Sequence, residues 1–225
     1  MAVAPDISEG GDPSTRERLM TTAERLFAEQ DYEDVSVRAV NAAAGTNAAA
    51  VHYYFGSKEA LVGAILERRM DQLNQWRQAR RAELVAGGRR PTRRQVVELL
   101  VRPLLDLMRD EPVSGPTYVR LLTRLYLQRA PIVVRQSQTT EPMWEELVTS
   151  ACADSGLSDE QVRLRWVLVV DSAFVALNWR FSRQDRFADP ELDWEAKSEG
   201  LLDFLTAGLG GVHPAPAVPE QQEGT

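Results

Sequence analysis

Residues 36–61 read Ser36-Val-Arg-Ala-Val-Asn-Ala-Ala-Ala-Gly-Thr-Asn47-Ala-Ala-Ala-Val-His52-Tyr-Tyr-Phe-Gly-Ser57-Lys-Glu-Ala-Leu61. This stretch predicts two short helices joined at a glycine and followed by a third helix. The expected caps of the three helices are Ser36, Asn47 and Ser57, whose side-chain oxygens can accept backbone hydrogen bonds. Gly45 stands where a tight turn requires a positive φ, which glycine adopts without steric cost. A short turn containing glycine between two helices is the helix-turn-helix, which places its second helix in the DNA major groove.

The run from Gly45 to Leu61 resembles the DNA-binding signature of the TetR family of one-component bacterial regulators. In that signature a Tyr-x-Tyr/His-Phe block follows the recognition helix and precedes a Lys-Glu-x-Leu helix start. The resemblance covers residues 14–66, and upstream it rests on Leu19, Ala23, Leu26, Phe27, Tyr32 and Val35. It implies a three-helix DNA-binding domain followed by a larger helical domain that binds an effector and dimerises.

The resemblance also implies which residues meet DNA. Arg38 is expected to reach a base edge or a phosphate, and a guanidinium can read guanine O6 and N7. We expect base specificity from Arg38, Asn47 and His52, and sequence-independent affinity from Lys58. The expected DNA-binding residues are Ser36, Arg38, Asn47, Ala48, Ala49, His52, Tyr53, Tyr54 and Lys58. Asn41 and Thr46 depart from the family pattern of Ala and Val, and we expect neither change to upset the fold.

Composition favours a cytoplasmic helical protein. Of the 225 residues 44% are hydrophobic, and no apolar run reaches the roughly 18 residues that span a membrane. The first residues lack the basic and apolar regions of a secretory signal. The lone Cys152 fits a reducing compartment. Two histidines and one cysteine leave little for a zinc site, so we expect neither a metal nor a cofactor.

The net charge of −7 is unusual for a protein that binds phosphates. Residues 14–60 hold five basic and seven acidic side chains, but most of the acids cluster in the loop at residues 29–34. Ten arginines lie between Arg68 and Arg102, against three acids. Two interpretations of this basic block stay open, a solvated helix face or a contribution to the electrostatics near DNA.

The remaining pattern predicts an all-α chain, because no segment alternates with period two. We expect disordered tails at 1–13 and 211–225, a helix-turn-helix domain at 14–60 and a helical effector-binding and dimerisation domain at 61–210. Loop-separated helices are expected at 14–30, 57–86, 92–110 with a kink at Pro103, 117–129, 131–156, 158–181 and 192–209.

The body offers two sets of candidate residues. Polar and aromatic side chains within apolar helices predict an effector site built from Tyr118, Arg120, Arg124, Trp144, Trp166, Asp171 and Asn178. Arginines 120 and 124 are candidate partners of Asp171 or of an acidic ligand. The apolar stripes of the last two helices predict a homodimer interface through Val162, Trp166, Val169, Leu177, Leu202 and Leu205.

These patterns together predict a homodimeric repressor, released from a palindromic DNA operator by a small hydrophobic or amphipathic effector. We expect no enzymatic activity, because the sequence has no phosphate-binding glycine loop and no Ser/His/Asp or Cys/His set. A regulator or scaffold that acts through protein contacts without binding DNA is the alternative. The helix beginning at Ser57 is expected to transmit the signal, since it spans both parts.

Overall fold

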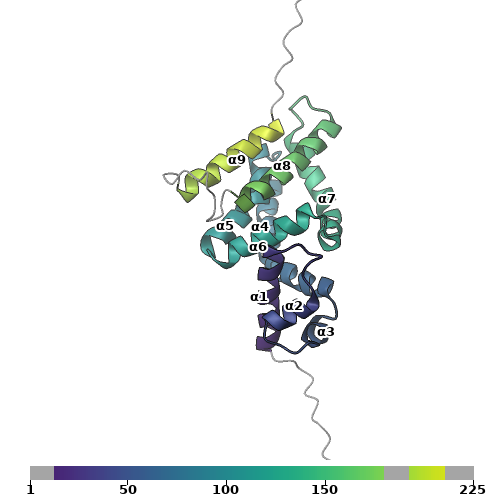
Figure 1. The fold of residues 1–225 in the computed structure, drawn as a ribbon. Coiled ribbons are helices and arrows are strands. Elements are labelled where there is room, and N and C mark those ends of the chain that lie inside the picture. Colours follow the sequence, from purple (N-terminus) through teal and green to yellow (C-terminus); the bar gives the residue numbers. More distant parts are fainter. Residues whose placement is uncertain (1–12, 180–192, 211–225) are drawn as a thin grey trace, which may run out of the picture.

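The computed structural model describes residues 13–179 and 193–210, and within these ranges it contains helices and no strand, which confirms the all-α prediction. Residues 1–12 and 211–225 of the expected tails, the end of the helix at 158–181 and residue 192 lie outside the described residues, while Pro13 begins the first helix. Figure 1 labels the helices α1 (Pro13–Glu29), α2 (Val37–Ala43), α3 (Ala50–Phe55), α4 (Lys58–Ala86), α5 (Arg93–Asp110), α6 (Ser114–Leu127), α7 (Pro131–Ala151), α8 (Asp159–Trp179) and α9 (Trp194–Gly210).

Helices α1 to α3 and the first turns of α4 form a head at one end of the molecule (Figure 1). Its apolar centre is fully buried and includes Leu19 and Phe27 of α1, Val40 of α2, Val51 of α3 and Leu61 of α4. Burial of such side chains stabilises a small domain by roughly 1.5–3 kcal/mol each. The head therefore has a core of its own that can fix the direction of α2 and α3.

Two helices connect the head to the body formed by α5 to α9. Helix α4 begins in the head and continues into the body, as the sequence predicts, and α6 packs along α1. At the end of α6, Arg124 forms an ion pair with Asp31, and Gln128 Nε2 donates to the same carboxylate at 2.7 Å. Asp31 lies in the loop between α1 and α2, so α6 is bonded directly to the head.

Helix ends in the body follow local capping. The Thr92 hydroxyl and the Gln95 side chain form a capping box at the start of α5, and Ser158 and Gln161 exchange equivalent bonds before α8. Helix α6 begins at Ser114, within the stretch that the sequence predicts as a loop. The turn is that short because Gly115 allows α6 to approach α5: a Cβ there would lie 2.4 Å from the Leu107 carbonyl oxygen.

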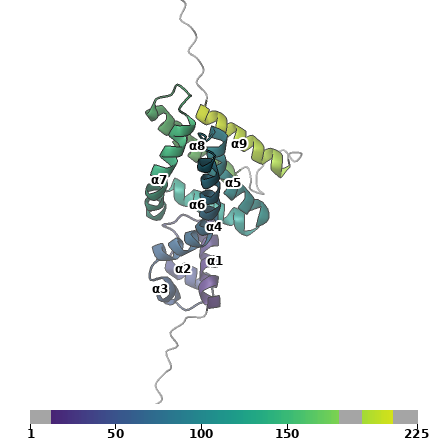
Figure 2. The same ribbon diagram turned by 180° about the vertical axis from the view of Figure 1, so that it is seen from behind.

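The body is built around α5, which packs against α4, α6 and α9, while α8 packs against α6, α7 and α9. Figure 1 shows α8 and α9 crossing one side of the body, and the reverse view in Figure 2 brings α4 to the front. Within the described residues, no helix has the length and apolar character needed to cross a membrane.

Candidate DNA-binding head and effector cavity

The turn of the helix-turn-helix is held by Asn41, which is buried at the end of α2. Its Nδ2 donates to the Ala48 carbonyl at 2.7 Å, and its Oδ1 accepts from the Val51 backbone N–H at 3.1 Å. The Thr46 backbone N–H and hydroxyl both donate to the Asn41 carbonyl oxygen. Gly45 adopts a φ of 64°, as the sequence predicts. Asn41 therefore fixes both ends of the turn, a role that sequence reasoning missed.

The caps of the short helices differ from one another. The Ser36 hydroxyl accepts from the Ala39 N–H at 3.0 Å, and the Ser57 hydroxyl accepts from the Ala60 N–H at 3.0 Å, so both predicted caps are confirmed. The Asn47 carboxamide accepts from the Ala49 N–H at 3.0 Å, but α3 begins only at Ala50. Asn47 thus stabilises the turn before the helix, and the predicted helix cap is wrong.

Most of the predicted DNA-binding residues are exposed on the surface of α2, α3 and the turn between them. The exposed members are Ser36, Arg38, Asn47, Ala48, Ala49, His52 and Tyr53. Arg38 has no hydrogen-bond or ion-pair partner among the described residues, so its five N–H donors are available. The Tyr53 side chain is 65% exposed, although large aromatic groups are usually buried, while Tyr54 is half-buried and meets Tyr53 edge-on.

His52 presents one ring nitrogen to solvent. Its Nδ1 lies 3.0 Å from the Gly56 carbonyl oxygen, which can only accept, so Nδ1 carries the proton of this bond. Nε2 is left for a further partner. The exposed surface of α3 therefore offers an imidazole nitrogen beside the methyl groups of the alanine run.

Lys58 differs from the prediction. Its ammonium donates to the backbone carbonyls of Tyr32 at 2.6 Å and Val35 at 3.1 Å, and lies 4.2 Å from the centre of the Tyr32 ring. All three groups belong to the connection between α1 and α2. The ammonium is thus used inside the head to hold this connection, and the assignment of Lys58 to a DNA phosphate is corrected.

A cavity of about 440 Å³ lies in the body between α4, α5, α6, α7 and α8. Its wall is mainly apolar, with Leu100 and Leu104 of α5, Phe174 of α8, and the two indoles of Trp144 and Trp166, whose ring centres are 5.2 Å apart. A volume and a lining of this kind are typical of sites for small molecules.

Only two of the predicted effector residues, Trp144 and Trp166, line this cavity. The Tyr118 side chain is fully buried with its hydroxyl unbonded, and burial raises its pKa. Arg124 pairs with Asp31 of the head instead of Asp171, which corrects the pairing expected from the sequence. Arg120 and Asn178 are half-buried outside the cavity lining.

Asp171 reaches the cavity indirectly. The hydroxyl of Tyr126, which lines the cavity, donates to Asp171 Oδ1 at 2.7 Å. Burial and the neighbouring carboxylate both raise the pKa of Tyr126, so this phenol stays protonated and keeps donating. In the sequence Tyr126 lies between Arg124 and Gln128, whose side chains both bond to Asp31 of the head. The effector residues predicted from the sequence do not include Tyr126.

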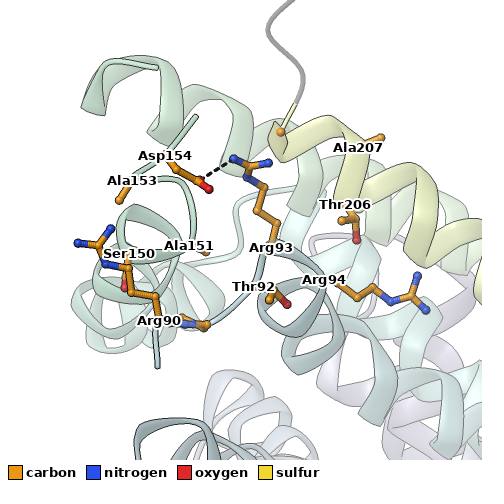
Figure 3. Close-up of a pocket in the computed structure, with 12 residues that line it drawn as sticks. Arg90, Thr92, Arg93, Arg94, Ser150, Ala151, Ala153, Asp154, Thr206 and Ala207 are labelled. Carbon is orange, nitrogen blue, oxygen red and sulfur yellow. Dashed lines mark hydrogen bonds and ion pairs between the residues drawn. The ribbon is translucent and has the colours of Figure 1, made fainter. Parts of the chain in front are cut away.

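A larger hollow of about 680 Å³ lies at the other end of the body, where the starts of α5 and the ends of α7 and α9 meet (Figure 3). Two of the three arginines in its lining, Arg93 and Arg94, already have acidic partners, and the third, Arg90, is exposed. Arg93 pairs with Asp154 at 2.9 Å (Figure 3), and Arg94 pairs with Glu98, Glu199 and Asp203. The hollow thus has charged walls, most of whose charge is paired within the chain, which makes it a poorer site for an apolar molecule.

The residues predicted for a dimer interface mostly belong to the core of a single chain. Val162, Val169, Leu177, Leu202 and Leu205 are buried against the chain's own helices, and Trp166 lines the cavity. The five buried residues are not available to a second chain, which corrects the prediction for them, whereas Trp166 is half-buried. The apolar side chains that α8 and α9 expose are Leu164, Val167, Leu168, Val175 and Phe204.

The chain combines a helix-turn-helix head, whose second helix is exposed, with a helical body that contains a cavity of small-molecule size. This combination defines a class of DNA-binding regulators. Residues 19–65 match the family model described as bacterial regulatory proteins, tetR family. An uncharacterised HTH-type transcriptional regulator of Mycobacterium tuberculosis (strain CDC 1551 / Oshkosh), MT1294, is 30% identical over 155 residues, which cover 68% of this chain and 70% of the relative.

The HTH-type transcriptional repressor KstR2 of Rhodococcus jostii (strain RHA1) is 25% identical over 80% of this chain and 86% of its own length. A TetR-like transcriptional regulator from Rhodococcus sp. RHA1 has the same fold, with a TM-score of 0.57 at 17% identity over 89% of this chain and 98% of that structure. The chain belongs to the TetR family of transcriptional regulators, and it is a DNA-binding regulator.

Proposed function

We propose that the protein is a homodimeric repressor that binds a palindromic operator and leaves it when a small molecule occupies the 440 Å³ cavity. The observation that carries this proposal is the row of exposed side chains on α2, α3 and their turn, at the end of the molecule away from the cavity. Arg38 and His52 offer hydrogen-bonding groups for base edges, and the alanine methyls suit thymine. Ser36, Tyr53 and Tyr54 offer hydroxyl groups for phosphates.

The proposed dimer joins two chains through the outer faces of α8 and α9. The exposed side chains on α8 recur at positions 164, 168 and 175, which follow one face of a helix, with Phe204 on α9. Exposed large apolar side chains that share a face are typical of protein–protein contact surfaces. A second copy is the proposed occupant, because one head covers only one half-site and a twofold pair brings two heads to one operator.

The proposed signal runs from the cavity to the head through α4 and α6. Helix α4 contributes Asn74 and Arg77 to the cavity wall and its first turns to the head core. Helix α6 contributes Tyr126 to the wall, while Arg124 and Gln128 bond to Asp31. A ligand that binds one arrangement of these helices more tightly than the other shifts the spacing of the two heads. The affinity of the protein for the ligand and its affinity for DNA are then coupled reciprocally. We retain 14–60 and 61–210 as the proposed functional division of the chain.

Selection of bound sequences from a random DNA library tests this proposal. We expect a palindrome whose half-sites lie about one helical turn, or a multiple of it, apart, with two chains or a multiple of two bound per site. In the same assay Arg38→Ala should weaken binding to the selected site by about 1–3 kcal/mol and relax one base position. Arg25→Ala is the control, since Arg25 is exposed on α1 and pairs with Glu29.

Selection of no sequence, or of a single half-site bound by one chain, would contradict the proposed operator. An Arg38→Ala variant that weakens binding to all sequences equally would instead assign this residue to a phosphate.

A further inference from the structure

One arginine in the cavity wall, Arg77, has no acidic partner among residues 13–179 and 193–210. Of the ten arginines between Arg68 and Arg102, all described, seven lie within ion-pair distance of a carboxylate, and the other three are Arg77, Arg89 and Arg90. Arg89 and Arg90 are exposed, whereas Arg77 is half-buried in the wall of the 440 Å³ cavity. Burial lowers the pKa of Arg77. A cation in such a place is partly desolvated, and within the described part of the chain it has no counter-ion.

The position of Arg77 follows from the proline inside α5. Pro103 has no N–H, so the carbonyl of Leu99, four residues earlier, loses its helical donor. Arg77 Nε donates to that carbonyl at 3.1 Å, and one terminal nitrogen donates to the Leu100 carbonyl at 3.3 Å. The other terminal nitrogen makes a long contact of 3.4 Å with Asn74 Oδ1. These bonds use three of the five N–H groups and only neutral acceptors, so the positive charge stays uncompensated.

The other charged groups of the cavity lie at its outer edge. Glu141, Glu145 and Arg163 are exposed, and Glu145 pairs with Arg163 at 3.4 Å. The half-buried part of the wall therefore combines apolar and aromatic groups, a few neutral polar groups and the single charge of Arg77. A charge-assisted bond in such surroundings is stronger and more selective than the same bond in water.

We propose that the cavity binds an amphipathic organic anion, with a carboxylate against the Arg77 guanidinium and an aromatic or aliphatic body against Trp144, Trp166 and Phe174. The inference rests on the proposed function, because it takes this cavity to be the effector site. To the proposed function it adds the sign of the ligand's charge and the residue, Arg77, that selects a ligand of that charge. The exposed Glu141 and the two tryptophans of the wall would instead suit an organic cation, which aromatic rings can bind. The experiment below distinguishes a cationic ligand from the proposed anion.

The experiment measures direct binding by isothermal titration calorimetry, without DNA, for matched probes that share one apolar body: phenylbutyrate, phenylbutyramide and phenylbutylamine. Two other monocarboxylates, hexanoate and naphthoate, test the tolerance for shape. The wild-type chain is expected to bind at least one carboxylate, and to bind phenylbutyrate more tightly than its amide and amine by about ten- to hundredfold.

Two variants assign the preference to one side chain. Arg77→Gln keeps a donor for the α5 carbonyls and removes the charge, so the preference for the carboxylate is expected to disappear. Arg77→Lys keeps the charge and should retain most of the preference. Arg80→Gln is the matched control, because Arg80 lies on the same helix and pairs with Glu83 of that helix. Thermal unfolding of each variant confirms that it is folded.

Any one of four results would overturn the inference. These are tighter binding of the amine, equal binding of the three matched probes, binding of none of the carboxylates, and a preference for the carboxylate that survives in Arg77→Gln. Because these measurements contain no DNA, they remain interpretable if the operator selection fails. Conversely, an operator that is found and released by a cation would leave the proposed function intact and reject only the anion.

Discussion

The head and the body each place a polar side chain among apolar neighbours, and they satisfy it differently. In the head, both ends of the buried Asn41 carboxamide are bonded to the backbone on the far side of the turn. In the body, Arg77 has hydrogen-bond acceptors but no counter-ion. A polar group that is fully satisfied within the chain favours a single conformation. A polar group that is only partly satisfied can still form a strong bond with a ligand. The contrast therefore distinguishes the head, which keeps one conformation, from the body, which can respond to a ligand.

The largest effect is expected from Asn41→Leu in the head. The variant leaves the Ala48 carbonyl and the Val51 N–H without partners in a buried turn, which should cost about 2–4 kcal/mol of stability. Thermal unfolding and gel shift with the selected operator measure the two consequences, and we expect operator binding to be lost. Thr46→Val gives a graded comparison, because it removes one half-buried hydroxyl and should cost about 1 kcal/mol. Equal effects of the two variants would remove the special role given to Asn41.

An intermediate effect is expected from Leu168→Glu on the outer face of α8. A twofold interface contains each substitution twice, and burial of two carboxylates without partners should weaken dimerisation by about 2–4 kcal/mol. Light scattering across a dilution series measures the change. Val113→Glu is the control, since Val113 is 78% exposed in the connection between α5 and α6. A wild-type chain that is monomeric at micromolar concentration, or a Leu168→Glu dimer of unchanged affinity, would remove α8 from the interface.

The smallest effect on stability, and the most informative about coupling, is expected from Arg124→Ala. The ion pair with Asp31 is partly exposed, and pairs of this kind contribute about 0–1 kcal/mol. Operator affinity in the absence of a ligand should therefore change little, while the fold-change in operator affinity caused by a saturating ligand should decrease. Arg109→Ala serves for comparison, because Arg109 pairs with acids of its own helix. Unchanged coupling in Arg124→Ala would leave α4 as the route between cavity and head.

The sequence predicts the head better than the body, and the reason is the distance over which each feature is determined. Ser36, Gly45 and Ser57 act on atoms within three residues of themselves or on their own backbone angles, so a short stretch is enough to place them. Thr92 and Ser158 are predictable for the same reason. Lys58 is different, because its partners precede it by 26 and 23 residues and only the folded head brings them together.

The errors in the body have a similar origin. Helix α8 is apolar on nearly all sides, with Val162 and Leu177 buried and Leu164 and Leu168 exposed. Hydrophobic periodicity therefore cannot tell which side faces the chain's own core. The pairing of Arg124 with Asp31 joins residues 93 positions apart, and no local pattern indicates it. The Arg77 site could be predicted in part, because Pro103 within a helix implies a carbonyl without a helical donor. The sequence does not indicate which helix supplies the new donor.

The position of Cys152 has a practical consequence. This thiol is the only one in the chain, it is buried beside the Leu209 carbonyl, and burial raises its pKa, so it reacts slowly with alkylating reagents. A cysteine introduced at the exposed Ala42 of α2 would therefore take a spin label or a fluorophore selectively, without removal of the native thiol. In a twofold assembly each protomer would carry one reporter, and the distance between the two reporters would follow the separation of the two heads as probes are added.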